Sequence, residues 1–262
     1  MRRYSLVWGV LLLLLGLLML ADAAGVRLGG IRPMNFFWPV VLILLGVWMI
    51  LGVTRRGSMI TEQASVDLQG ASEAVVKINH GAGELQIAGG AGMGQLASGT
   101  FTGGLDQTSH LNGTRLDVHL SPPGPQFLFT PRFERYDWDL RLNSGIPMAL
   151  TLHMGANRAV MDLSSLQITE LKMETGASQV DVTLPARGRL QAKFSLGAAS
   201  LTIRVPEGLA ARIQVSHGAS DLKVDESRFP RMGEYYQSTD FGTAQNTVEL
   251  KIEAGAAEIK VQ

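Results

Sequence analysis

The sequence contains no cysteine among its 262 residues. Disulfide bonds, thiolate metal sites and cysteine nucleophiles are therefore excluded, although the absence of cysteine fits any cellular compartment. The sequence also lacks Gly-x-Ser-x-Gly, which marks one class of serine nucleophile, and His-x-x-x-His, a common zinc-binding spacing. We therefore expect a protein that is not an enzyme, with no catalytic residue, no metal and no cofactor.

The five histidines and one glycine-rich segment do not change this expectation. The histidines are His80, His110, His119, His153 and His217. No carboxylate motif accompanies them, so surface histidines are the simpler interpretation. Residues 89–94 look like a phosphate-binding loop but lack the Gly-Lys-Ser/Thr ending and a following helix, so a turn is the better interpretation.

Positive charge is scarce outside the first 57 residues. That segment holds six arginines and one acid, which gives +5, whereas the remaining 17 basic and 22 acidic residues give −5. Nucleic-acid binding requires a cluster of positive side chains, and the acidic part has no basic run. We expect no nucleic-acid partner.

Two long apolar runs occupy residues 5–21 and 36–53. Each is long enough to cross the roughly 30 Å hydrocarbon layer of a bilayer as a helix of about 17–25 residues. The sequence therefore predicts a two-helix transmembrane hairpin in residues 1–57, with the lipid bilayer as its partner. A signal peptide is the alternative, because Ala21-Asp22-Ala23 resembles a cleavage site after a basic start.

Arginines predict the orientation of this hairpin. Four lie on the terminal sides of the spans, at positions 2, 3, 55 and 56, and two lie between them, at positions 27 and 32. Positive residues are enriched on the cytoplasmic side. We therefore expect a protein of the cytoplasmic membrane with two spans and a cytoplasmic C-terminal domain.

The rest of the chain is built on a repeat. Gly-Ala dipeptides begin at Gly81, Gly155, Gly176, Gly197, Gly218 and Gly255. Three consecutive steps from position 155 are 21 residues long, and the last is 37, which is one period plus a 16-residue insertion. A fixed period of this length is typical of a repeat architecture.

Apolar and polar residues alternate on both sides of each dipeptide. Alternation with period two predicts a strand, a corner and a second strand, with one face buried. The fold class is therefore mainly β, a β-solenoid with rungs of about 21 residues over residues 74–262, after a linker at 58–73. The glycines are expected to form the rung corners, because glycine adopts backbone conformations denied to other residues.

Two segments, 124–141 and 225–246, interrupt the pattern and hold nine of the eleven aromatic residues beyond position 57. One interpretation is that they cover the flanks or ends of the solenoid. The other is that they dock a partner. For the second segment the candidate partner surface is Phe229, Tyr235, Tyr236 and Phe241.

The chain resembles a known family at this point. Trp8-Gly9, the Phe37-Trp38-Pro39 start of the second apolar run and the arginine pair after it resemble the two-helix unit of LiaI/LiaF-type membrane proteins. The stretch from Trp138 to Pro147, with the Gly-Ala rungs, is similar to the adhesin-like toastrack domain that often follows that unit. The resemblance implies a bacterial protein of the cell-envelope stress response. LiaF-like members restrain a membrane sensor kinase, although they can have more than two spans.

Three functions remain open. The first is a membrane-anchored, non-enzymatic regulator or scaffold of the envelope stress type, with a membrane sensor kinase or a similar membrane protein as partner. The second is a structural module that assembles end to end into homo-oligomers. The third is a carbohydrate-binding or carbohydrate-active solenoid outside the cytoplasm, for which Asp221 and Glu258 are the one pair of acids that follow each other in a row.

Overall fold

The structure is a computed structural model that describes residues 61–123 and 135–262, together with Gly16, Leu20, Trp38, Pro39 and Leu42. Apart from these five residues, the two predicted membrane spans lie outside the described part. Among the residues that are described, no helix is both long and apolar enough to cross a membrane.

The described residues 61–123 and 135–262 form a compact unit that is almost entirely β. This confirms the mainly β fold class. Its strands are β1 (Thr61–Asp67), β2 (Glu73–Gly89), β3 (Gln95–Thr102), β4 (Asp106–Asn112), β5 (Arg115–Ser121), β6 (Tyr136–Leu142), β7 (Pro147–Asp162), β8 (Gln167–Thr175), β9 (Gln179–Thr183), β10 (Arg189–Arg204), β11 (Ala210–His217), β12 (Asp221–Val224), β13 (Arg231–Met232), β14 (Tyr235–Gln237) and β15 (Thr247–Val261).

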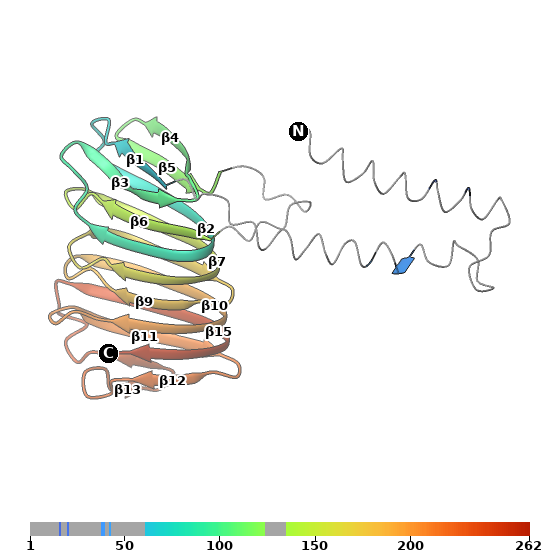
Figure 1. The fold of residues 1–262 in the computed structure, drawn as a ribbon. Helices are drawn as coiled ribbons and strands as arrows, with labels where there is room; N and C mark the ends of the chain where they lie inside the picture. Colours follow the sequence, from blue (N-terminus) through green and yellow to red (C-terminus); the bar gives the residue numbers. More distant parts are fainter. Residues whose placement is uncertain (1–15, 17–19, 21–37, 40–41, 43–60, 124–134) are drawn as a thin grey trace, which may run out of the picture. The chain divides into compact units, whose positions relative to one another are not determined.

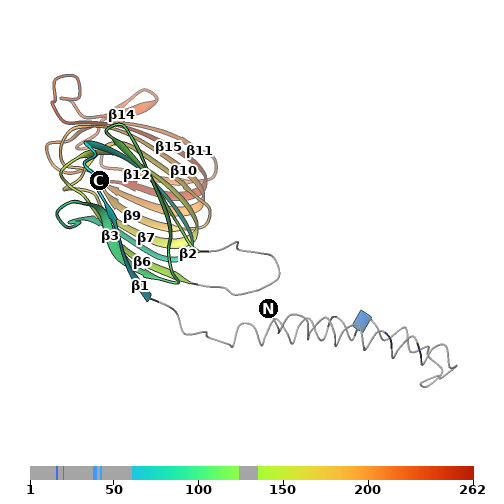
Figure 2. The same cartoon turned by 90° about the horizontal axis from the view of Figure 1, so that it is seen from above.

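Each repeat forms one rung, and the rungs stack in parallel as in a ladder (Figure 1). In β2, β7, β10 and β15 one long strand runs through the glycine, whereas β8 with β9 and β11 with β12 make rungs that are interrupted there. Neighbouring rungs pair residue for residue, as β2 and β7 do from Ala74 opposite Met148 onward. Viewed from above, successive rungs lie over one another (Figure 2).

The alternating apolar rows form one continuous core. In the row five residues before the glycine, the exposed fraction of every side chain is at most 3%. This row consists of Val76, Leu150, Leu171, Ala192, Ile213 and Leu250. Trp138, Phe101 and Phe194 are the largest side chains fully buried in the core. Period-two patterning therefore identified the buried face correctly.

The rungs do not stack in sequence order. β15, which carries Gly255, lies between β10 and β11 and pairs in parallel with both. The rungs of Gly197 and Gly218 are therefore not neighbours, although they are one 21-residue period apart. The segment 225–246 connects the end of β12 to the start of β15, and so allows β15 to lie between β10 and the rung of Gly218.

The region before Gly155 also differs from a regular series. The predicted linker at 58–73 contains β1, which pairs antiparallel with β3 from Thr61 to Asp67. Its inward Val66 is buried and explains why this polar stretch is held in the sheet. β5 and β6 form a further rung beside β2, each pairing with one half of it.

Candidate functional site

The repeat glycines form a column along one edge of the solenoid. If a Cβ atom were added at Gly155, Gly197 or Gly176, it would lie 2.6, 2.9 or 3.2 Å from the backbone oxygen of the glycine in the neighbouring rung. At Gly255 and Gly218 the corresponding distances, to the oxygens of Gly197 and Gly255, are 3.1 and 3.0 Å. The glycines are therefore needed because adjacent backbones approach closely.

This corrects the expected reason for the glycines. At the five positions from Gly155 to Gly255 the backbone does not adopt the left-handed conformation that glycine alone favours. Positive φ values occur instead in the connections between rungs, at Gly188 (96°) and Gly208 (80°). The corner glycines act by lacking a side chain, and the connection glycines act through their backbone freedom.

An open groove runs beside the glycine column. It consists of two hollows that share Ser195. Outward side chains two residues before each glycine line it, namely Asn79, His153, Glu174, Ser195, Ser216 and Glu253. His153 Nδ1 lies 3.2 Å from Glu174 Oε2, and both side chains are exposed. No Phe, Tyr or Trp is among the lining residues, and apolar residues such as Leu196, Met154 and Pro122 lie beside the polar ones.

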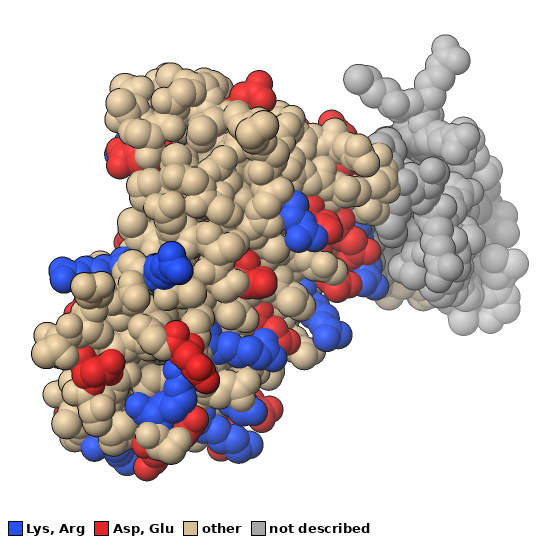
Figure 3. All heavy atoms as spheres, turned by 90° about the vertical axis from the view of Figure 1, so that its left-hand side faces the viewer, with Lys and Arg blue, Asp and Glu red and all other residues tan. Residues whose placement is uncertain are grey.

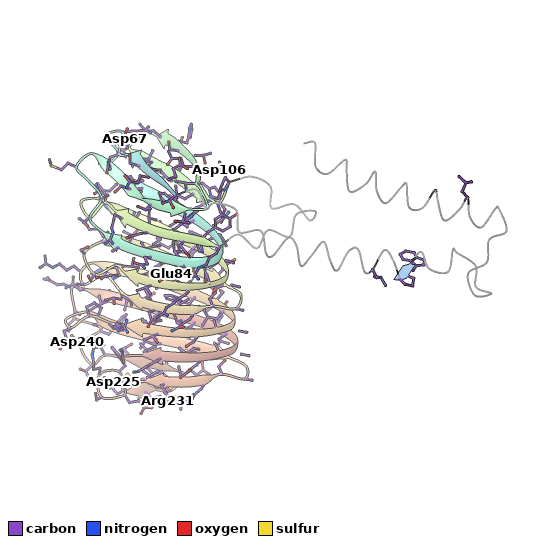
Figure 4. The ribbon with its side chains drawn as sticks, viewed as in Figure 1. Asp67, Glu84, Asp106, Asp225, Arg231 and Asp240 are labelled. Carbon is purple, nitrogen blue, oxygen red and sulfur yellow. The ribbon has the colours of Figure 1, made fainter. Side chains whose placement is uncertain are left out.

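The described residues bring together no cluster of three or more histidines or carboxylates that could hold a metal ion. Labelled acids such as Asp67, Glu84, Asp225 and Asp240 are spread along the stack (Figure 4). Asp221 and Glu258 do lie opposite each other because β15 is inserted, and Lys223 Nζ lies 2.9 and 3.6 Å from their carboxylates. An exposed ion pair of this kind is a surface feature rather than an acid–base pair.

Many charges on the outer faces are paired with an opposite charge. Glu253 binds both Lys193 and Lys251, at 3.0 and 2.9 Å, and Lys172 binds Glu170 at 2.6 Å. Figure 3 shows Lys and Arg beside Asp and Glu on one such face, with no large area of a single sign. Neither a polyanion nor a polycation is favoured as a partner for this face.

A buried polar cluster lies behind the groove. The His80 side chain is 2% exposed, and its Nε2 lies 3.0 Å from the carbonyl oxygen of Tyr136, to which Nε2–H donates. Its Nδ1 lies 3.1 Å from Nδ2 of Asn157, and Trp138 packs against the imidazole edge-on. Sequence reasoning assigned His80 to the surface and did not identify Asn157, because 77 residues separate these two partners.

Burial lowers the pKa of His80 below its ordinary value of 6.5, although the Tyr136 carbonyl and Asp137 act in the opposite direction. The imidazole therefore binds a proton less readily in the folded protein than in the unfolded chain, so below about pH 6.5 the unfolded chain binds more protons. We expect stability to fall as the pH drops from 7.5 to 5.5. Urea midpoints of the wild type and His80→Gln measure this. The other four histidines stay in both proteins, so an equal pH slope would contradict the prediction.

The segment 225–246 covers the last rung. β14 pairs antiparallel with β11, and β13 pairs with β14. Phe229 is 1% exposed and belongs to the core, so it is not part of a partner surface. Tyr236 packs against the core from its partly buried position. These two side chains therefore pack onto the core rather than form an exposed surface.

The other two aromatic residues of this segment face outward around an arginine. The Arg212 guanidinium carbon lies 4.5 Å from the ring centre of Phe241 and 5.6 Å from that of Tyr235. Tyr235 is 37% exposed, and Met232, directly opposite it on β13, is 49% exposed. We call these four residues the cap patch. Arg212 and Met232 could not be predicted from the sequence, because their position depends on the antiparallel pairing of β14.

The family of the N-terminal domain of toast_rack, DUF2154, matches residues 55–204. A crystal structure of a candidate cell adhesion protein from Clostridium sporogenes is similar in fold, with 23% identity, a TM-score of 0.66 and coverage of 78% of this chain and 100% of that one. A candidate adhesin from Bacteroides fragilis has 7% identity over 78% of this chain and 97% of that one, and its TM-score of 0.25 supports no statement about fold. No curated protein matches the chain.

Proposed function

The chain belongs to the family of the toast_rack N-terminal domain, and we propose that it is a membrane-anchored, non-enzymatic scaffold that binds other envelope proteins. The main support for this proposal is the composition of the cap patch. Aromatic residues, methionine and arginine are enriched at the centres of protein interfaces. Here Met232 and Tyr235 lie exposed on the β13–β14 hairpin, beside Arg212 of β11 and the half-buried Phe241 that follows β14.

The hairpin is held firmly enough to present a preformed surface. Ser238 donates its backbone N–H to the carbonyl oxygen of Ala211 at 2.9 Å, and its hydroxyl oxygen accepts from Ala211 N–H at 2.9 Å. Arg212 Nε donates to Gln237 Oε1 at 2.8 Å. A surface that is already ordered loses little conformational entropy when a partner binds.

The two apolar runs before residue 57 support a membrane anchor, and their arginines support a domain on the cytoplasmic side. The resemblance of this region to LiaI/LiaF-type proteins supports a role in the envelope stress response, with a membrane sensor kinase as the partner.

A reporter fused after residue 262 tests the orientation of the C-terminal domain. Activity only with an extracytoplasmic reporter would contradict a cytoplasmic domain.

End-to-end assembly is less well supported. At one end β4 is exposed along its whole length and places Gln107 and Ser109 opposite the buried Leu120 and Val118. Polar residues over the core discourage a further strand from pairing there. At the other end the β13–β14 hairpin covers β11, so both ends carry a terminating element.

We expect Tyr235→Ser combined with Met232→Ser to reduce partner binding at least about tenfold, since loss of interface anchors costs roughly 1.4 kcal/mol or more. The melting midpoint should change little because both side chains are exposed. Crosslinking in the membrane of the bacterium that carries the protein, followed by quantification of sensor kinases bound to the full-length chain, measures the effect.

Tyr236→Ser is the matched control for this experiment. Its ring packs against the core, so we expect a lower melting midpoint. A folded Tyr235/Met232 double variant that retains all its crosslinked partners would remove the cap patch from the proposed function.

A further inference from the structure

β15 lies between β10 and β11, two strands that follow each other directly in the sequence. It pairs with β10 over fourteen residue pairs from Arg189 opposite Thr247, and with β11 from Ala210 opposite Thr247. β15 is thus a central strand of the stack, although it comes after β11 and β12 in the sequence. β10 and β11 are consecutive in sequence and are separated in space by β15 alone.

β10 and β11 would be in register without β15. Residues 184–188 connect β9 to the adjacent β10, and a connection of the same length, residues 205–209, joins β10 to β11. The 21-residue period means that direct pairing would place Phe194 opposite Val215 and Leu201 opposite Leu222. Apolar residues would meet apolar residues, and the gap between β10 and β11 could close without a change of register.

The charges on β15 are compatible with either arrangement of the strands. Lys251 lies opposite Lys193 and Glu258 opposite Asp221, but Glu253 bridges the two lysines and Lys223 bridges the two acids. Direct pairing of β10 with β11 would instead place Gln214, Ser200 and Thr202 opposite Lys193, Asp221 and Lys223, so that no like charges would be opposed at these positions.

The segment before β15 is long enough for exchange between molecules. The cap holds to β11 up to Ser238, whose backbone N–H binds Ala211, and β15 begins at Thr247. The eight residues between them span roughly 27 Å when extended. β15 can therefore reach a neighbouring molecule while the β13–β14 hairpin stays on its own rung, with Phe241 leaving its place beside Arg212.

We propose that the gap between β10 and β11 is a strand-binding site that accepts β15 of a second copy as well as β15 of its own chain. The ligand is an extended segment with apolar residues at every second position, in the parallel register of β15. When β15 leaves, β11 pairs directly with β10, which keeps the core covered until a strand enters again. Two copies that exchange β15 are thereby linked through complete rungs.

The absence of cysteine from the natural sequence allows a direct test in the full-length protein. Ser195 lies opposite Glu253 of β15 and both side chains face outward, so cysteines at these positions are about 4.8 Å apart, within disulfide reach. Ser195→Cys and Glu253→Cys proteins are purified separately, mixed, held in urea below the unfolding midpoint, returned to buffer and oxidised. We expect at least tenfold more disulfide-linked dimer than in a mixture of Ser195→Cys with Glu174→Cys, which are opposed on β10 and β8.

A second variant tests closure within one molecule. Ser195 and Ser216 are two strands apart, roughly 9.6 Å, which exceeds the reach of a disulfide. In the closed arrangement they lie opposite each other. Ser195→Cys/Ser216→Cys should form an internal disulfide in the same urea treatment and not in buffer alone. Mixed dimer no more abundant than in the Glu174→Cys control would overturn the strand-binding site, and no internal disulfide would overturn its closure.

Discussion

The Ile203→Asp variant is expected not to fold. Ile203 is fully buried in β10, between Val182 of β9 and Val261 of β15. A carboxylate there would have no partner, and burying it costs several kcal/mol, a large part of the roughly 5–15 kcal/mol that stabilises a domain. Limited proteolysis and far-ultraviolet circular dichroism of the purified protein should show loss of the β-structure.

Thr202→Asp is the matched control for this variant. Thr202 is the preceding residue of the same strand, faces outward and lies opposite Asp181 and Lys260. Its replacement should lower the free energy of unfolding by no more than about 1 kcal/mol, because Asp181 repels the new carboxylate and Lys260 attracts it. If both variants were equally resistant to protease, the inward and outward assignment of β10 would be wrong.

The second large effect is expected at Gly155. A Cβ atom there would lie 2.6 Å from the backbone oxygen of Gly81, so the two rungs would have to separate at the column. Gly155→Ala should lower the free energy of unfolding by about 1–3 kcal/mol, the range for overpacked sites, and Gly155→Val by more. Urea denaturation followed by circular dichroism measures the change.

The distances along the column predict a graded series. Gly197→Ala should be less harmful than Gly155→Ala, and Gly176→Ala less harmful still, because their Cβ contacts are 2.9 and 3.2 Å. Gly242→Ala is the control, since no atom lies within 4 Å of its Cβ position and its φ is not in the left-handed region. It should be neutral or stabilising by up to about 1 kcal/mol. Equal losses at all four sites would mean that backbone entropy, rather than contact between rungs, makes glycine necessary.

The six-fold Gly-Ala pattern and its flanking alternation were sufficient to predict a stacked β-repeat and the identity of its core. Each rung is determined locally, because apolar residues at alternate positions can be buried only if the segment is extended with one face inward. Val182 and Ile203 occupy alternate positions of this kind, and both are fully buried. The toastrack resemblance rests on the same pattern and is confirmed by the family match.

The order of the rungs was decided by the tertiary structure alone. Leu201 can meet Ile259 or Leu222 equally well, because every rung presents the same alternation in the same register. Pairing information of this kind is degenerate in a repeat, so the sequence does not determine which rung follows β10. The insertion of β15 therefore could not be predicted from spacing.

The sequence by itself determined the strand character of the rungs, their buried rows and the positions where glycine is required. Only the tertiary structure decided why glycine is required, which aromatic residues of 225–246 are buried, and that His80 meets Asn157 inside the fold. The physical reason is common to all three. Periodicity is a local property of the chain, whereas contact between backbones, capping of an open end and pairing of buried polar groups depend on segments that are distant in sequence.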